Sequence, residues 1–171
     1  AHTHPMQISS FAAPDSVTRW SAIDDGVMGG LSQSRLRYDP AGYAVFEGNV
    51  SLEQNGGFAS VRCAPQAGLG LAGVVAYVLE ARGDGHRYKL NLRTDDNFDG
   101  LQYQAAFTVP AEIWTRVRLP LDQFRPTFRG RVVPGAPALD PARVRQLGLM
   151  IADRQAGPFA LCVRGIEVEV G

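Results

Sequence analysis

Apolar and polar residues alternate along most of this sequence with a period of two. Within residues 87–93, Tyr88, Leu90 and Leu92 would share one face of a strand, while the polar residues between them would share the other. The same alternation predicts further strands near residues 34–38, 43–52, 58–63, 73–82, 102–108, 114–118, 147–152 and 158–170. Helical periodicity is nearly absent, so the sequence predicts an all-β fold.

Turn-forming residues separate these strands at short and fairly even intervals. Asn55 and Gly56 predict a tight hairpin turn, because both central positions of a type I′ turn need positive φ. Gly83 and Gly85 predict a second turn. Strands and turns spaced in this way are typical of an antiparallel β-sandwich or barrel.

Three local features add detail to this fold. The apolar positions of the last strand change parity across Arg164 and Gly165, which predicts a β-bulge. Pro141 suits the first position of a short helical turn that Asp140 would cap. Residues 124–139 are rich in Pro and Gly and are predicted to form the longest irregular region, and loops of that length are often functional.

The length of 171 residues fits one domain with a sizeable core, which we place at residues 6–171. Residues 1–5 contain two of the three histidines and are interpreted as an N-terminal extension or a cloning remnant outside the fold. Two distant cysteines, Cys63 and Cys162, lack metal or redox spacing and are predicted to be free thiols in a reducing compartment.

The charge balance argues against nucleic acid as a partner. Lys and Arg total 17, and Asp and Glu also total 17, so no global positive field would attract a polyanion. No apolar run reaches the roughly 20 residues that a membrane span needs, and the chain does not open with a signal peptide. We therefore expect neither a nucleic-acid partner nor a membrane span.

Residues for catalysis are sparse. His86 is the one histidine outside residues 1–5, and neither a nucleophile elbow nor a dinucleotide-binding glycine motif is present. Asp24 and Asp25 are adjacent, so in an extended segment they would point to opposite faces instead of flanking a substrate. The sequence therefore predicts a protein that is not an enzyme and needs no cofactor.

Calcium is the one metal that the sequence suggests, and only weakly. Asp95, Asn97 and Asp99 occupy alternate positions before Gly100, as in the first half of a calcium-binding loop. The twelfth position is Ala106, where such a loop requires a bidentate Glu. A plain acidic turn is the simpler interpretation.

A ligand-binding face would form if the strands at 87–93, 102–108 and 114–118 were neighbours. Their polar sides would then bring together an indole, an amide and guanidinium groups, which suit a carbohydrate as well as a protein partner. The residues concerned are Arg93, Gln104, Trp114 and Arg116.

Several stretches together resemble the NADH:ubiquinone oxidoreductase complex I intermediate-associated protein family. They run in order from about residue 20 to residue 168. The stretches are Trp20 with Asp24-Asp-Gly-Val-Met-Gly-Gly-Leu-Ser32, Phe46-Glu-Gly-Asn-Val-Ser51, Asn55-Gly-Gly-Phe-Ala-Ser60, Arg82-Gly-Asp-Gly85, Phe128-Arg-Gly-Arg131 and Gln155-Ala-Gly-Pro-Phe159.

The resemblance implies a galactose-binding-like β-sandwich of the jelly-roll type, and a chaperone-like assembly factor for respiratory complex I without catalytic activity. The first arginine is Arg19, so the chain shows no Arg-rich transit segment, and we expect a free-standing bacterial cytoplasmic member. The function expected is a non-enzymatic module that binds a protein, such as respiratory complex subunits. A carbohydrate or other small-ligand module is the alternative.

The surface expected to bind the partner combines three loops. Apolar anchors beside planar cations are typical of protein interfaces. The residues are Asp24, Asp25, Met28, Phe58, Phe124, Arg125, Phe128, Arg129 and Arg131.

Overall fold

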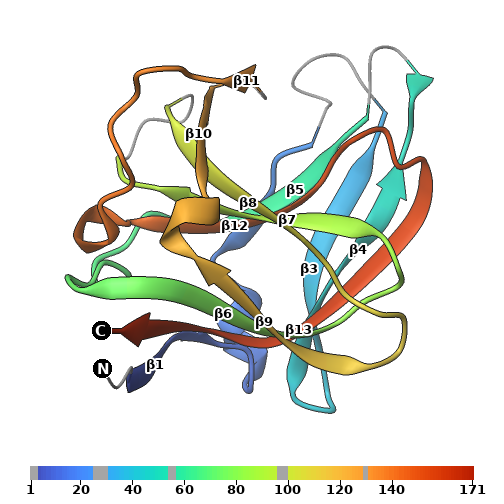
Figure 1. Cartoon of the computed structure of the whole chain (residues 1–171). Coiled ribbons are helices and arrows are strands. Elements are labelled where there is room, and N and C mark those ends of the chain that lie inside the picture. Colours follow the sequence, from blue (N-terminus) through green and yellow to red (C-terminus); the bar gives the residue numbers. More distant parts are fainter. Residues whose placement is uncertain (1–3, 25–30, 54–56, 96–99, 129–130) are drawn as a thin grey trace.

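In the computed structural model, which describes residues 4–24, 31–53, 57–95, 100–128 and 131–171, two antiparallel β-sheets pack face to face (Figure 1). Three short 3-10 helices accompany them: η1 (Pro14–Val17), η4 (Leu121–Gln123) and η5 (Pro141–Arg143). None of the helices among these residues is long and apolar enough to cross a membrane. The predicted antiparallel β-sandwich is confirmed.

The described strands form one six-stranded and one seven-stranded sheet. The first sheet has the order β3 (Gln33–Asp39), β4 (Tyr43–Val50), β13 (Gly157–Val170), β6 (Val74–Arg82) and β9 (Trp114–Pro120), with β1 (His4–Ser10) pairing with β13. The second has the order β11 (Arg131–Val132), β10 (Arg125–Phe128), β8 (Gln102–Thr108), β7 (Arg87–Arg93), β12 (Gln146–Ile151), β5 (Ala59–Cys63) and β2 (Trp20–Ala22).

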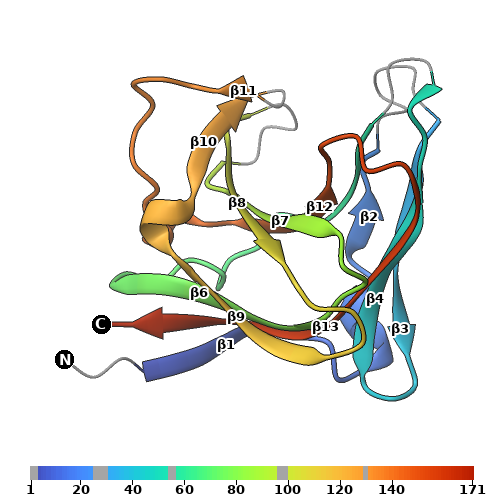
Figure 2. The ribbon, with the colours of Figure 1, turned by 45° about the vertical axis from the view of Figure 1, so that its right-hand side comes forward.

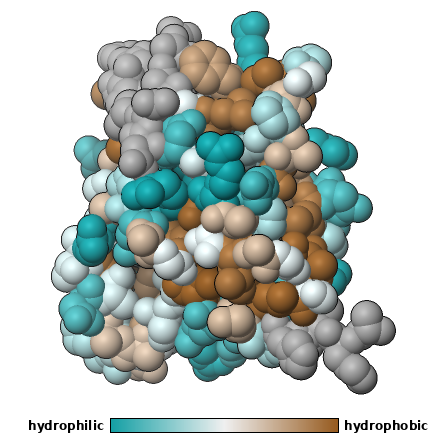
Figure 3. Space-filling model, turned by 90° about the vertical axis from the view of Figure 1, so that its left-hand side faces the viewer, coloured by the Kyte–Doolittle hydropathy of each residue, from teal (hydrophilic) through white to brown (hydrophobic). Residues whose placement is uncertain are grey.

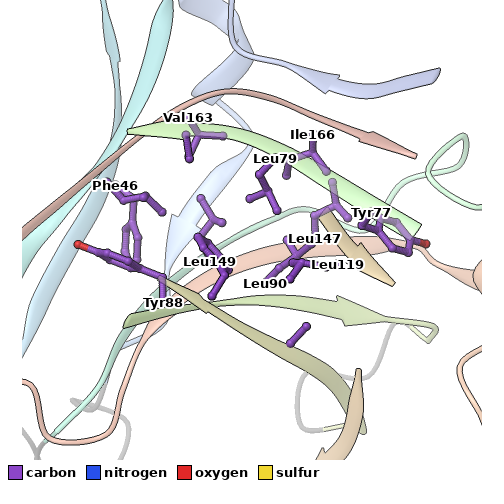
Figure 4. Packing of buried hydrophobic residues seen from close by; sticks show 14 of the residues in the cluster. Phe46, Tyr77, Leu79, Tyr88, Leu90, Leu119, Leu147, Leu149, Val163 and Ile166 are labelled. Carbon is purple, nitrogen blue, oxygen red and sulfur yellow. The ribbon is translucent and has the colours of Figure 1, made fainter. Parts of the chain in front are cut away.

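The apolar faces of the two sheets meet in one hydrophobic core (Figure 4). Tyr88 and Leu90 of β7 are fully buried, as their alternation with polar residues predicts. Across the core, the ring centroid of Phe46 on β4 lies 6.2 Å from that of Tyr88. Burial of each large apolar side chain contributes about 1.5–3 kcal/mol, which is why the period-two pattern determines which face of each strand turns inward.

The predicted local details are also confirmed. The pairing of β13 with β6 shifts register between Val163 and Gly165, which is the expected β-bulge. The Asp140 side chain accepts a hydrogen bond from the backbone N–H of Ala142 at 3.0 Å and caps η5. Both cysteines are free.

The hairpin predicted at Asn55 and Gly56 is wrong. These two residues lie outside the described ones, but the strands on either side of them do not pair: β4 lies in the six-stranded sheet and β5 in the seven-stranded sheet. The turn around Gly83 and Gly85 likewise carries the chain from β6 in one sheet to β7 in the other. A turn motif reports local backbone geometry, and it does not reveal whether the next strand returns to the same sheet.

Two segments are more regular than predicted. Residues 125–128 and 131–132, within the expected irregular region, form β10 and β11 at the edge of the seven-stranded sheet. Strand β1 starts at His4, inside the stretch that the sequence analysis leaves out of the fold, and pairs with the C-terminal half of β13. Both depend on pairing with strands distant in sequence, which local patterns do not encode.

The seven-stranded sheet is strongly curved. Figure 2 shows β10 and β11 on one side, and β2 on the other, rising beside the central strands β8, β7 and β12. The side of this sheet that faces away from the core is here called the outer face.

Candidate functional site

The outer face carries polar side chains that are almost as buried as the core. Asn91, Arg93 and Gln104 expose only 5%, 3% and 9% of their surface. Polar residues on the outward side of an antiparallel sheet are ordinarily solvated. Their burial indicates that the outer face lies in a recess.

One line of residues crosses this face from strand to strand and is here called the outer row. Its members pair directly with one another across β5, β12, β7, β8 and β10. They are Arg62, Gly148, Asn91, Gln104 and Arg125. Four strand spacings of about 4.8 Å give the row a length of about 19 Å.

The centre of the outer row holds hydrogen-bonding groups with weak partners. The side-chain amides of Asn91 and Gln104 donate to the Met150 sulfur, at 3.9 Å and 3.6 Å. A thioether is a weak acceptor. The buried Oδ1 of Asn91 has no hydrogen-bond partner among the described residues. A ligand with acceptor and donor groups of its own, such as a peptide backbone, would satisfy both amides better than the sulfur does.

Cationic side chains lie along and beside the row. Burial and, after it, the positive charge of Arg93 lower the pKa of Arg62. Lys89 lies in the adjacent row on β7, with its Nζ 3.7 Å from a carboxylate oxygen of Asp153. The charged side chains that the described strands of this sheet contribute are all cationic.

The predicted partner-binding residues fall at opposite edges of this face. Arg125, Phe128 and Arg131 lie on β10 and β11 at one edge and are exposed, Phe128 by 41%. Arg129 lies outside the described residues. The expectation for Phe124 is wrong: its ring is 5% exposed and packs 5.5 Å from the Tyr77 ring, so it belongs to the core.

At the other edge, Asp24 has a structural role. Its carboxylate accepts hydrogen bonds from the backbone N–H groups of Ser34, at 2.9 Å, and Ser60, at 3.0 Å, and so links β3 to β5 across the two sheets. Phe58 is half-buried. Two further candidates, Asp25 and Met28, lie outside the described residues. The two edges flank the outer face and do not form one continuous loop surface.

The expected grouping of Trp114 and Arg116 with Arg93 and Gln104 is wrong. Strand β9 pairs with β6, so Trp114 and Arg116 lie on the six-stranded sheet. There the Arg164 guanidinium stacks 3.9 Å from the centroid of the Trp114 ring. The chain changes sheet between β8 and β9, which the polar alternation of the strands does not indicate. Only Arg93 and Gln104 of the expected set share a face.

The weak calcium candidate stays a hypothesis. Asp95 follows β7, whereas Asn97 and Asp99 lie outside the described residues.

A second recess lies at the corner between β6 and β7. It encloses about 540 Å³, and Arg82, Asp84, Glu112 and Cys162 are among its lining residues. The groups around it bind one another: Arg82 donates a hydrogen bond to the Cys162 sulfur at 3.6 Å, and Asp84 accepts hydrogen bonds from its surroundings. These hydrogen bonds give the lining residues a structural role, which is to stabilise the corner between the two sheets.

One end of the sandwich, on the side of β10, β11 and the chain ends, has a mixed surface. Figure 3 shows a band of polar side chains between an apolar area near the top and a larger one below. Met6 and Val75 are among the exposed apolar residues, at 50% and 38%. Among the described residues of this end, no row of buried polar side chains like the outer row is found.

Of the five residues in the outer row, the sequence analysis names only Gln104 and Arg125 as candidate binding residues. Arg62, Gly148 and Met150 were absent from the candidates, and Asn91 appeared only as part of an alternating strand. Polar residues that alternate with core residues on two neighbouring strands are the one signal available, and it identifies a face without showing that the face is recessed.

Comparison with known proteins gives a family and a fold. Residues 9–163 match the family model of complex I intermediate-associated protein 30 (CIA30). The protein called "Complex I intermediate-associated protein 30, mitochondrial" is 26% identical in Drosophila melanogaster, over 95% of this chain and 62% of that protein. The Neurospora crassa protein of the same name is 25% identical, over 94% and 72%. This chain thus spans about three fifths of the length of the Drosophila relative.

Among solved structures, the family 11 carbohydrate-binding module of the cellulosomal cellulase Lic26A-Cel5E of Clostridium thermocellum is similar, with a TM-score of 0.73 and 12% identity. The match covers 100% of this chain and 97% of that module, and at this identity it concerns the fold. The expectation of a bacterial cytoplasmic protein is wrong on these comparisons, because both relatives are named as mitochondrial proteins.

Proposed function

Since this chain belongs to the complex I intermediate-associated protein 30 family, we propose that it is a non-catalytic protein-binding module that takes part in the assembly of respiratory complex I. The family match extends over nearly the whole sandwich, so the proposal concerns this domain itself. The outer face of the seven-stranded sheet is where we propose that the partner binds.

The main reason for placing the partner on this face is the outer row of buried polar side chains. A free protein ordinarily satisfies its buried polar groups, and Asn91 and Gln104 instead donate to a thioether. A polypeptide seated in the recess would supply carbonyl and N–H groups to both amides.

The carbohydrate alternative is less well supported. Its main argument was an exposed indole beside amide and guanidinium groups, and Trp114 lies on the other sheet beneath Arg164. The likeness to a carbohydrate-binding module supports the fold and does not transfer the ligand.

Capture from cells tests the proposal. The tagged chain, expressed at native level in its source organism, is isolated under mild detergent, and complex I subunits are quantified by mass spectrometry. Ala106 lies on the outer face, paired with Lys89, so Ala106→Trp would obstruct the recess. Ala41, an exposed residue in the turn between β3 and β4, provides the matched control Ala41→Trp.

The wild type and Ala41→Trp are expected to capture complex I subunits, whereas Ala106→Trp is expected to lose them while keeping the melting temperature of the wild type. Absence of complex I subunits from the wild-type capture would contradict the assembly role. Equal capture by both variants would contradict the choice of face.

A further inference from the structure

The two sheets carry very different charges. The described strands of the six-stranded sheet hold six arginines and five carboxylates, namely Arg35, Arg37, Arg82, Arg116, Arg118 and Arg164, with Asp39, Glu47, Glu80, Glu167 and Glu169. The described strands of the seven-stranded sheet hold six cations and no carboxylate, namely Arg62, Arg87, Lys89, Arg93, Arg125 and Arg131. The chain as a whole has zero net charge, so the segments between the strands carry the compensating negative charge.

On the six-stranded sheet the charges neutralise one another across neighbouring strands. Arg118 binds Glu169 at 2.8 Å, and Arg164 binds Glu80 at 2.7 Å. Such a surface has little net attraction for a charged partner.

On the seven-stranded sheet the carboxylates near the cations come from outside the strands. Asp153, in the turn after β12, lies 3.7 Å from Lys89 Nζ and 3.8 Å from Arg87 Nε. Asp95 lies next to the Arg93 guanidinium, beside Gly100. Among the described residues the strands themselves therefore contribute only positive charge, and most of it alternates with core residues and so faces the recess.

The outer row sets the length over which these cations are spread. Arg62 and Arg125 stand at the two ends of this row, whose length along the sheet is about 19 Å, with the amides of Asn91 and Gln104 between them. Gly148, in the same row, has no side chain, which lets another backbone approach the sheet closely. An extended chain rises about 3.3 Å per residue, so about six residues would span the row.

We propose that the partner enters the outer row as an extended, acidic segment, with carboxylates toward Arg62 and Arg125 and backbone groups toward Asn91 and Gln104. The inference rests on the proposed protein-binding function and specifies the chemistry of the segment that binds. Carboxylates pair well with guanidinium groups, which can bind both oxygens of one carboxylate.

Fluorescence anisotropy with two labelled peptides tests the inference on the full chain. Decaglutamate is long enough to span the row, and decaglutamine has the same length without charge. Decaglutamate is expected to bind, and to bind more weakly as salt is raised, because ions screen the pairing. Equal binding of decaglutamine, or binding of a neutral mixed-linkage glucan tetrasaccharide in place of decaglutamate, would overturn the inference.

Two double variants, each lacking two positive charges, test which sheet binds decaglutamate. Lys89→Gln with Arg125→Gln removes two positive charges beside the recess, and Arg116→Gln with Arg118→Gln removes two from the six-stranded sheet. We expect the first pair to weaken decaglutamate binding roughly tenfold and the second less than twofold. Equal weakening would show a general charge effect and would overturn the inference.

A second comparison does not depend on the folding of the double variants. Ala106→Glu and Ala106→Gln place side chains of nearly equal size on the outer face and differ in charge. We expect decaglutamate to bind Ala106→Glu several times more weakly than Ala106→Gln. Equal affinity would overturn the inference.

The cellular capture separates this inference from the function on which it rests. If the wild type and the Lys89→Gln, Arg125→Gln variant capture complex I subunits equally, the acidic segment is wrong and the assembly role stands. If the wild type binds decaglutamate with the expected salt dependence but captures no complex I subunit, the assembly role is wrong and the acidic-segment chemistry stands.

Discussion

Asp84 stabilises the corner at which the chain passes from β6 of one sheet to β7 of the other. We expect Asp84→Asn to lower the unfolding free energy by about 3 kcal/mol. The carboxylate accepts hydrogen bonds from the backbone N–H of Ala160 on β13, at 2.8 Å, and from the Tyr88 hydroxyl, at 2.9 Å. The backbone N–H of His86 also donates to it, at 3.1 Å. Asn keeps the shape and one acceptor oxygen, but its NH₂ group would face donors.

The magnitude follows from the charge of the group. Hydrogen bonds to a charged acceptor contribute about 1.5–3 kcal/mol each, and Asn weakens at least two of them. For a domain of this size, each kcal/mol shifts the melting temperature by about 2–4 °C, so the expected decrease is about 6–12 °C. Thermal unfolding followed by near-ultraviolet circular dichroism at pH 7 measures it.

The difference between Asp84→Asn and the wild type should depend on pH. Burial raises the pKa of Asp84, but the hydrogen bonds from Ala160, His86 and Tyr88 outweigh it, and the folded-state pKa lies below the ordinary value of 3.8. A lowered carboxyl pKa stabilises the fold above the unfolded-state value and loses that contribution as pH falls through the folded-state value. The difference in unfolding free energy between the wild type and Asp84→Asn should be constant above about pH 5 and should become smaller below about pH 4.

Glu80→Gln is the matched control. Glu80 pairs with Arg164 at 2.7 Å, but its side chain is 40% exposed, so the pair contributes less than about 1 kcal/mol. A cost of Asp84→Asn no larger than that of Glu80→Gln would refute the reasoning.

Three further outcomes follow from packing. A Cβ at Gly48 would clash with the backbone oxygen of Gln33 on β3, so Gly48→Ala should lower the unfolding free energy by at least about 2 kcal/mol in urea titration. An unchanged urea midpoint would contradict this close contact. Burial raises the pKa of the Cys63 thiol, while Cys162 is partly exposed, so a thiol reagent should modify Cys162 in the folded protein and both only after unfolding. Arg118→Ala should cost under about 1 kcal/mol by thermal unfolding, since the Arg118 side chain is half exposed, and a loss above about 2 kcal/mol would be inconsistent with that.

The strands could be predicted because their signal is local. Alternation along β7 identifies both the buried Leu90 and the outward Asn91, and the parity change at Gly165 identifies the bulge. Each of these needs only neighbouring residues in the chain.

The assignment of strands to sheets could not be predicted in this way. Strand β9 follows β8 directly along the chain, yet it pairs with β6, and this removes Trp114 from the expected ligand face. The outer row joins Arg62 to Asn91 through a strand more than fifty residues further along. Pairing between distant segments depends on the packing of the whole core, so a face made from five strands becomes visible only in the folded structure.

Site-specific photo-crosslinking in the cell tests the central claim most directly. A photoreactive phenylalanine analogue at position 106, on the outer face, is compared with the same analogue at position 41, in the turn between β3 and β4. The account predicts cross-links to a complex I subunit from position 106, with at most weak ones from position 41. Cross-links to complex I subunits from position 41 alone, or from neither position, would contradict a partner-binding role of the outer face.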